Sequence, residues 1–400
     1  MTTYSRTEAA DRAGVSVDWL TRLVDLEIVK PAEGDRFTAG DSRRAELVQS
    51  LEKAGIPMEG LAAAIRGGTL ALDFLDAAAY DRFSLLSDVT FGQLSEKTGV
   101  PLNLLTLIRE VAGSAAPDPD DRVREEEMAV ADFVGAQVKA GFRPIAIERL
   151  LRVQGDALRR MAETEADWWQ SEVIAPAIAS GGDAQMLGAD DFATELSTLA
   201  ERSIIATYHA QQAHAWTGNI ITGFEQLMAN AGLHSRLERP PAVCFLDITG
   251  YTRMTQERGD AAAAELATNL SRVVDRTAVR HGGRTIKWLG DGVMFVFPEV
   301  GPGVVAALEM ADGVVGAGLP PSHVGLHAGP VIFQGGDYYG ATVNMASRIA
   351  EYARPGEVLV SQAVVDASST PQVTFTEIGP VELKGVSGAV QLHAAHQATA

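Results

Sequence analysis

The chain has 400 residues, of which 46% are hydrophobic and 21% are charged, a composition typical of globular proteins with enough material for two or three domains. Its formal net charge of −19 argues against a general binder of nucleic acid or of anionic membranes. A single cysteine, Cys244, excludes an intrachain disulfide framework. Because the sequence has neither a signal-peptide pattern at its start nor an apolar run of about 18 residues, it predicts a soluble cytoplasmic protein with no membrane span.

Residues 1–189 are predicted to form a helical regulatory domain with two similar units, at about 1–70 and 86–152. The units align at an offset of 85 residues, which places Gly14-Val15 on Gly99-Val100. Each unit has the pattern of a short helix, a Gly-Val turn, a second helix and a later helix after a Lys-Ala-Gly motif. This order resembles the DNA-binding unit of MerR-type regulators, which is built on a helix-turn-helix.

The charge of these units argues against DNA binding. Residues 1–66 contain nine Lys or Arg against eleven Asp or Glu, whereas phosphate contacts supply most of the affinity for DNA. The second helix of the second unit, residues 102–109, is almost wholly apolar. Such a helix suits packing or the lining of a ligand pocket. We therefore expect protein interaction or sensing, with a small molecule, a lipid or a proton as the candidate effector.

Residues 190–238 are predicted to form a long linker helix that ends before Pro240-Pro241, directly upstream of a strand. A helix that leads straight into a catalytic strand is able to transmit a conformational change. The helix contains His209 and His214, and histidine titrates near neutral pH, so pH sensing is one hypothesis. The alternative is that both are ordinary exposed residues of a surface helix.

Residues 239–400 are predicted to form an α+β domain. The apolar strand 243–247 ends in Asp247, and a hairpin about Gly290-Asp291-Gly292 presents a second aspartate at its tip. Two carboxylates at the ends of buried strands suit hard divalent cations such as Mg²⁺ or Mn²⁺. For either aspartate alone, a turn residue or a helix cap is the alternative.

Three motifs in this domain together resemble the catalytic domain of class III nucleotidyl cyclases, over roughly residues 241–395. They are Phe-Leu-Asp-Ile-Thr-Gly-Tyr (245–251), Lys-Trp-Leu-Gly-Asp-Gly (287–292) and Asp-Tyr-Tyr-Gly-Ala-Thr-Val-Asn-Met-Ala-Ser-Arg (337–348). The resemblance implies a ferredoxin-like βαββαβ fold. It also implies a lyase that converts ATP to cyclic AMP and pyrophosphate with two divalent cations, Mg²⁺ or Mn²⁺, per site.

The resemblance also implies roles for individual residues, each of which matches a position of the family's motifs. Asp247 and Asp291 correspond to the metal ligands, and Lys287 and Asp337 to the pair that recognises the purine. Asn344 corresponds to the residue that orients the ribose, and Arg348 to the residue that stabilises the transition state. The triphosphate is expected to bind Lys384 and the turn of Ile248, Thr249, Gly250 and Tyr251. The turn precedes a helix, whose free N–H groups are expected to hold phosphate oxygens.

The chemistry requires these residue types. Adenine presents an acceptor at N1 and a donor at its amino group, so Lys287 and Asp337 complement it and mispair with guanine. Asn344 and Arg348 lie four residues apart, on one helical face, and can therefore reach one substrate. Because the family's sites form between two catalytic domains, the resemblance implies a homodimer. The alternative function is a transcription regulator whose cyclase-like domain only binds nucleotide or dimerises.

Overall fold

The computed structural model describes residues 3–76, 80, 85–180, 191–234, 240–250, 257 and 259–398. The chain divides into two compact units, Met1–Gly223 and Phe224–Ala400, and the boundary falls inside the long helix α10 (Asp191–Asn230). Each unit is described by itself.

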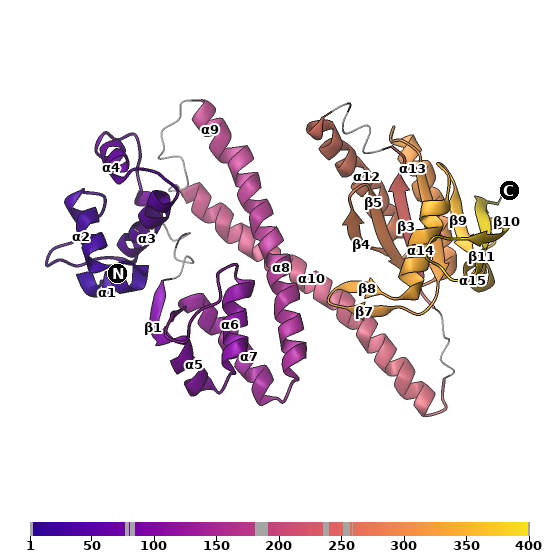
Figure 1. The fold of residues 1–400 in the computed structure, drawn as a ribbon, viewed down its shortest axis with the longest axis horizontal. Helices are drawn as coiled ribbons and strands as arrows, with labels where there is room; N and C mark the ends of the chain where they lie inside the picture. Colours follow the sequence, from indigo (N-terminus) through magenta and orange to yellow (C-terminus); the bar gives the residue numbers. More distant parts are fainter. Residues whose placement is uncertain are drawn as a thin grey trace. The chain divides into compact units, whose positions relative to one another are not determined.

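The first unit is mainly helical (Figure 1). Its elements are α1 (Arg6–Ala13), α2 (Val17–Asp25), α3 (Ala39–Lys53), α4 (Met58–Arg66), the 3-10 helix η1 (Asp73–Asp76), β1 (Leu86–Thr90), α5 (Phe91–Thr98), α6 (Leu102–Val111), β2 (Arg122–Arg124), α7 (Glu125–Lys139), α8 (Pro144–Trp169), the π-helical turn η3 (Gln170–Ile174) and α9 (Ala175–Ala179). The series α1 to α4 recurs as α5 to α8, at the offset of 85 to 86 residues that the sequence predicts.

Matching helix caps set the ends of the first helix in each repeat, α1 and α5. Ser5 and Thr90 accept hydrogen bonds from the third helical N–H of α1 and α5, and each helix completes a capping box. Both helices end at a glycine in the left-handed region, Gly14 at φ 65° and Gly99 at φ 71°, where a side chain would be strained. The Gly-Val turns of the sequence therefore end α1 and α5 and set the direction in which α2 and α6 begin.

The two repeats have separate hydrophobic cores. The first is built around Leu20, Leu23 and Phe37, and the second around Leu104 and Leu105. The apolar residues of α6 are thus mostly buried within its own repeat, which supports packing as the reason for their composition. The interpretation of the repeats as MerR-like helix-turn-helix units stays a prediction.

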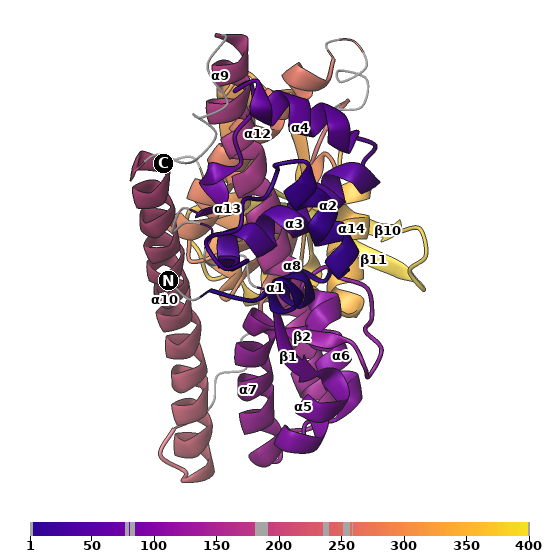
Figure 2. The same cartoon turned by 90° about the vertical axis from the view of Figure 1, so that its left-hand side faces the viewer.

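An antiparallel pair of strands, β1 and β2, adds sheet to a part predicted to be all helical. Figure 2 shows α5, α6 and α7 grouped around this pair. The two strands pair across more than 30 residues, and such a long-range pairing leaves no periodic signal in a short window of sequence. Ion pairs also join the repeats: Arg12 lies 2.6 Å from Glu125, and Arg124 lies 2.7 Å from Glu46.

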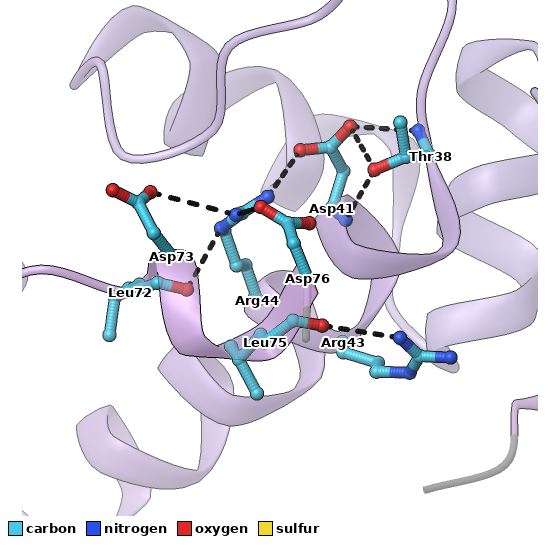
Figure 3. Close-up of polar contacts among 8 residues, drawn as sticks. All are labelled: Thr38, Asp41, Arg43, Arg44, Leu72, Asp73, Leu75 and Asp76. Atoms are coloured by element: carbon cyan, nitrogen blue, oxygen red, sulfur yellow. Dashed lines mark hydrogen bonds and ion pairs between the residues drawn. The ribbon is translucent and has the colours of Figure 1, made fainter. Parts of the chain in front are cut away.

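A buried polar cluster fixes the end of the first repeat (Figure 3). The guanidinium of Arg44, on α3, donates to Asp41 at 2.9 Å, to the Leu72 carbonyl at 3.3 Å and to Asp76. Arg44 and Asp41 are almost wholly buried. Because a buried guanidinium is costly unless its donors are satisfied, this cluster holds η1 against α3.

Helix α10 corresponds to the predicted linker helix but ends at Asn230, and residues 231–234 form a turn. His209 and His214 are both exposed on it. Several large apolar side chains of α10 are also exposed, namely Leu199, Ile205, Tyr208, Trp216, Ile220, Ile221, Phe224, Leu227 and Met228. Charged and polar residues separate these apolar side chains along α10. Within the described ranges, no helix is both long enough and apolar enough to cross a membrane.

The second unit contains a seven-stranded mixed sheet. Its elements are β3 (Ala242–Ile248), α12 (Asp260–Arg280), β4 (Arg284–Leu289), β5 (Gly292–Phe297), α13 (Val300–Gly316), β6 (Ser322–Ala328), β7 (Ile332–Gln334), β8 (Asp337–Tyr339), α14 (Ala341–Tyr352), β9 (Val358–Ser361), α15 (Gln362–Ala367), β10 (Val373–Glu382) and β11 (Ala389–Gln397). The strand order is β10-β11-β9-β6-β3-β5-β4. Within it, β3, α12, β4, β5, α13 and β6 follow the βαββαβ order of the predicted fold.

The sheet separates two helical layers, with α12 and α13 on one face and α14 on the other (Figure 1). Side chains of β3 alternate between these two faces. Cys244 and Leu246 belong to the hydrophobic core on the α13 side, and Val243 belongs to the core on the α14 side. Asp247 has the parity of Val243 and so belongs to the α14 face. The short hairpin of β7 and β8 forms its own two-stranded sheet.

Candidate active site

The two predicted metal-binding aspartates lie beside each other at one end of the central strands. Asp247 is the penultimate residue of β3 and pairs with Gly292 on one side and with His323 on the other. Asp291 occupies the turn between β4 and β5, and its carbonyl accepts a hydrogen bond of 3.3 Å from the Ile248 N–H. A Cβ at position 292 would lie 3.1 Å from the Asp247 Oδ1, so the glycine leaves room for that carboxylate.

The electrostatics of Asp247 fit a cation. Burial raises the pKa of its carboxyl, the neighbouring charge of Asp291 raises the pKa further, and His323 partly offsets both. Its Oδ1 is buried and accepts no hydrogen bond from the described residues. An ionised, half-buried carboxylate with an unpartnered oxygen beside a second carboxylate is stabilised by a divalent cation.

The protein alone offers few side chains that could bind a metal ion here. Among the residues that the structure describes, no three His, Cys, Asp or Glu side chains converge as a complete metal site. Mg²⁺ and Mn²⁺ commonly take only one or two carboxylates from the protein and fill the remaining positions with water and substrate phosphates. Asp247 and Asp291 therefore suit a cation that is carried in part by a phosphorylated substrate.

The predicted purine-reading pair is in direct contact. Lys287 on β4 and Asp337 on β8 are 50 residues apart in sequence, yet the Lys287 Nζ donates to the Asp337 Oδ2 at 2.5 Å. The other oxygen of Asp337 accepts from the Tyr338 N–H at 2.8 Å, which orients the carboxylate. Lys287 also lies 5.8 Å from the centre of the Tyr339 ring. The result is a donor and an acceptor held side by side.

Helix α14 carries Asn344 and Arg348 one turn apart. It begins after Gly340, whose φ of 125° is open to glycine and rarely to other residues. Asn344 is exposed, whereas Arg348 is partly buried and its Nη1 donates to both oxygens of Glu351 at 2.6 Å. This pair is solvent-exposed and spaced three residues apart, so it stabilises the helix only by about 0.2–0.5 kcal/mol and leaves the guanidinium available.

Residues 251–256, where the helix expected to bind phosphate begins, lie outside the described residues, and the turn before them is described through Gly250. Two of its N–H groups are not free, because Ile248 donates to the Asp291 carbonyl at 3.3 Å and Thr249 to the Pro321 carbonyl at 3.1 Å. These two N–H groups are therefore part of the backbone pairing at the end of β3, and phosphate binding by the N–H groups of the following helix stays a prediction. Gly250 is exposed, and Tyr251 lies outside the described residues. Lys384 is exposed beyond the end of β10.

The structure thus gathers the predicted residues into three groups: the two aspartates, the lysine–aspartate pair, and the two residues of α14. In the described part of the chain, no hydrogen bond or ion pair links one group to another. Sequence reasoning missed His323, whose Nε2 lies 3.6 Å from the Asp247 Oδ2. Only the register of β3 against β6 brings this histidine to the aspartate, and the motif around it gives no sign of the pairing.

Two segments of the chain match known protein families. Residues 24–193 match the adenylate cyclase regulatory domain, and residues 322–397 match the adenylate and guanylate cyclase catalytic domain. The second match contains Asp337, Asn344 and Arg348, whereas the two aspartates predicted to bind metal, Asp247 and Asp291, lie upstream of it.

Individual relatives extend over more of the chain. A protein of Mycobacterium tuberculosis (strain CDC 1551 / Oshkosh) named pH-sensitive adenylate cyclase is 26% identical over 368 residues, covering 90% of this chain and 89% of that protein. A protein of Streptomyces coelicolor named adenylate cyclase is 23% identical over 276 residues, covering 68% of this chain and 70% of that protein. The solved structure of the adenylyl cyclase CyaB from P. aeruginosa matches with a TM-score of 0.37 and 22% identity, over 40% of this chain and 95% of that chain. This chain is therefore similar to adenylate cyclase regulatory domains in its first half and to nucleotidyl cyclase catalytic domains near its end.

Proposed function

We propose that this protein is an adenylate cyclase, which converts ATP to 3′,5′-cyclic AMP and pyrophosphate at sites shared by two copies of the chain. The observation that carries the proposal is the contact of Lys287 with Asp337 at 2.5 Å, on the sheet face that also bears Asp247. The matches to cyclase domains and the names of the relatives support the same reaction class.

The lysine–aspartate pair supports ATP as the substrate. The Lys287 ammonium donates to the N1 of adenine, and the Asp337 carboxylate accepts from its amino group. Guanine offers the opposite polarity at both positions, and each buried mispairing costs roughly 1–3 kcal/mol. ATP is therefore favoured over GTP by about two powers of ten or more.

Asp247 and Asp291 are the residues that would hold the divalent cations. Bound Mg²⁺ or Mn²⁺ supplies charge neutralisation of the triphosphate and makes the ribose 3′-hydroxyl more acidic. The chain's own contribution is to place one carboxylate near the end of β3 and the other in the turn between β4 and β5. The Oδ1 of Asp247 accepts no hydrogen bond from the described residues, and Gly292 leaves room beside it.

Helix α14 contributes the remaining polar groups. Asn344 orients the ribose so that its 3′-oxygen faces the α-phosphate. Arg348, one turn later, stabilises the negative charge that grows on the phosphate oxygens as the bond to pyrophosphate breaks. Its release from Glu351 costs little, because that pair is exposed.

The first unit and α10 are the proposed regulatory part. The match of residues 24–193 to cyclase regulatory domains supports this assignment. A relative over most of the chain is named pH-sensitive, and His209 and His214 are exposed to solvent protons on α10. A proton or a small molecule is the proposed effector.

The first prediction is formation of cyclic AMP by the purified full chain. With ATP and Mn²⁺, we expect cyclic AMP and pyrophosphate in equal amounts, as measured by chromatography of the products. The Arg348→Ala variant should lose most of the activity, because it removes the group that stabilises the developing charge. Hydrolysis of ATP to ADP, or no reaction with either metal, would contradict the proposal.

The second prediction concerns the shared site. Asp247→Ala and Arg348→Ala proteins should each be inactive as homodimers. After mixing and exchange of subunits, half of the dimers are mixed, and each has one site with both residues intact. The mixture should therefore recover about a quarter of wild-type activity. If mixed dimers form, as judged by differently tagged subunits, and no activity returns, the site is not shared in this way.

A further inference from the structure

Helix α12 carries a row of three arginines on one face. Arg272, Arg276 and Arg280 follow each other at intervals of four residues, and all three are exposed. They line a groove of about 470 Å³ between α12 and α13, which Gln397 at the end of β11 also borders. Such a row of positive side chains stands out in a chain whose formal net charge is −19.

The floor of the groove is formed where the two helices approach each other. Val273 and Thr277 of α12 and Gly313 of α13 lie there, and a Cβ at position 313 would be 3.0 Å from the Val273 Cγ1. The Thr277 hydroxyl donates to the Val273 carbonyl at 2.9 Å. Because Gly313 has no side chain, the space above this floor stays open to a small ligand.

The two carboxylates on the α13 side of the groove already have partners. The Arg280 Nη1 donates to the Glu309 Oε2 at 3.1 Å, and the same oxygen lies 3.0 Å from the His281 Nε2. Asp312 accepts a hydrogen bond of 3.2 Å from the side-chain amide of Gln397. The carboxylate of Glu309 therefore compensates the charge of Arg280, at one end of the row.

Arg272 and Arg276 lack a carboxylate partner among the described residues. The Arg272 Nη1 donates to the neutral side-chain oxygen of Asn269 at 3.1 Å. In the part of the chain that the structure describes, no hydrogen bond or ion pair engages the Arg276 guanidinium. Two like charges one helical turn apart repel each other and destabilise the helix, so an anion between them would stabilise it.

The helix dipole accounts for only part of the row. Cations near the C-terminus of a helix are stabilised by the dipole, but this effect falls off within the last turn. Arg280 is the last residue of α12, whereas Arg272 lies two turns earlier. An anionic ligand accounts for Arg272 and Arg276, which the dipole leaves unexplained.

We propose that this groove binds a phosphate dianion between Arg272 and Arg276, as the head of a small phosphate ester or as free phosphate. Side chains four residues apart on a helix are close enough to converge on one group, and each planar guanidinium can pair with two phosphate oxygens. The volume of about 470 Å³ lies in the usual range for small-molecule sites and exceeds what one phosphate fills. We therefore expect the ester to bind more tightly.

The acidic side of the groove limits the ligand to a single phosphate. Glu309 and Asp312 face the arginine row across the groove, and their negative charges oppose a second phosphate there. A polyphosphate or a nucleic acid strand is thus disfavoured, in agreement with the charge of the whole chain.

This groove lies on a different face of the sheet from the candidate active site. Helices α12 and α13 pack on one face, whereas Asp247 has the parity of the α14 face. A ligand in the groove would therefore act as an effector on the second unit, and the inference does not depend on the reaction proposed above.

The first test measures the reactivity of individual arginines in the full chain. Phenylglyoxal modifies exposed guanidinium groups, and mass spectrometry after digestion by a protease that does not cut at arginine gives the rate at each residue. The probe is glycerol 3-phosphate at up to about 10 mM, in a chelating buffer of constant ionic strength. With a dissociation constant of about 1 mM, modification of Arg272 and Arg276 should slow about tenfold.

Arg149 is the internal control in the same digest. It is exposed on α8, and no hydrogen bond or ion pair in the described residues engages it, so its rate should not change. Inorganic phosphate, glycerol and pyrophosphate are the comparison ligands. Tighter protection by glycerol 3-phosphate than by inorganic phosphate identifies an ester as the ligand, and equal protection identifies free phosphate.

The second test is a variant at an exposed position. Arg276→Gln removes the charge and keeps a polar side chain, and calorimetry should show that glycerol 3-phosphate binds about tenfold or more weakly. In the same variant, the ester should no longer slow the modification of Arg272. Arg149→Gln should bind the ester as tightly as the wild type, and the melting temperatures of both variants show whether they are folded.

Three results would overturn the proposal. Unchanged rates at Arg272 and Arg276 at the highest ester concentration exclude the site. Equal slowing at Arg149, or protection by glycerol alone, shows an effect that is not binding of phosphate in this groove. Stronger protection by pyrophosphate than by either single phosphate contradicts the role of the acidic side. The cyclase proposal is unaffected in each case, because the experiment contains neither ATP nor free divalent cations.

Discussion

Asp247→Asn should abolish cyclic AMP formation and at the same time make the metal-free protein more stable. Several kcal/mol of transition-state stabilisation depend on the cation that this carboxylate holds, which corresponds to a loss of roughly a thousandfold or more in kcat/KM. Asparagine has the same shape and removes only the charge. The measurement is the rate of product formation beside the melting temperature in a chelating buffer.

The expected gain in stability follows from the raised pKa of Asp247. Burial and the charge of Asp291 both favour the protonated carboxyl in the folded protein. A raised folded-state pKa stabilises the fold at low pH, and this contribution is lost as the pH rises through that pKa. At neutral pH the ionised carboxylate therefore costs stability, and the difference between wild type and Asp247→Asn should shrink on acidification.

Two controls make this result specific to the site. Mn²⁺ together with a non-cyclisable ATP analogue should raise the melting temperature of the wild type by mass action and leave that of Asp247→Asn unchanged. Asp312→Asn, on α13 and hydrogen-bonded to Gln397 at 3.2 Å, should change neither activity nor this response. A fall in metal-free melting temperature for Asp247→Asn would contradict the account of its environment.

Local signals predicted the repeats and most element positions. Caps such as Ser5 and Gly14 act within one turn of helix, so the sequence alone locates α1 and, at the constant offset, α5. The apolar strands β3 and β5 were predictable for the same reason, because their composition and flanking turns are local. The Gly-Asp-Gly turn between β4 and β5 follows from the glycines and the apolar strands beside it.

The pairings between distant segments were not predictable from the residues. The hairpin of β7 and β8 stands apart from the main sheet, and only the resemblance to cyclases, not periodicity, suggested that Asp337 belongs beside Lys287. The register that brings His323 to Asp247 depends on β3 lying between β5 and β6. The backbone partners of the Ile248 and Thr249 N–H groups, the carbonyls of Asp291 and Pro321, also come from distant segments.

The largest expected change in specificity comes from Lys287→Glu combined with Asp337→Cys. The glutamate accepts hydrogen bonds from the N1 and amino groups of guanine, and the smaller thiol no longer offers adenine a charged acceptor. Since each mispairing costs roughly 1–3 kcal/mol, the ATP:GTP ratio of kcat/KM should fall by about two powers of ten or more. The measurement is the rate of cyclic nucleotide formation from each substrate under the same metal concentration.

This experiment is informative because the pair is separate from the aspartates. No described contact joins Lys287 or Asp337 to Asp247 or Asp291, so Mn²⁺ binding by the double variant should equal that of the wild type. Each single variant should lose activity with both nucleotides, since one group then remains unpaired against either base. If the ATP:GTP ratio stays unaltered while the protein binds metal normally, the contact of 2.5 Å is a structural ion pair and base selection occurs elsewhere.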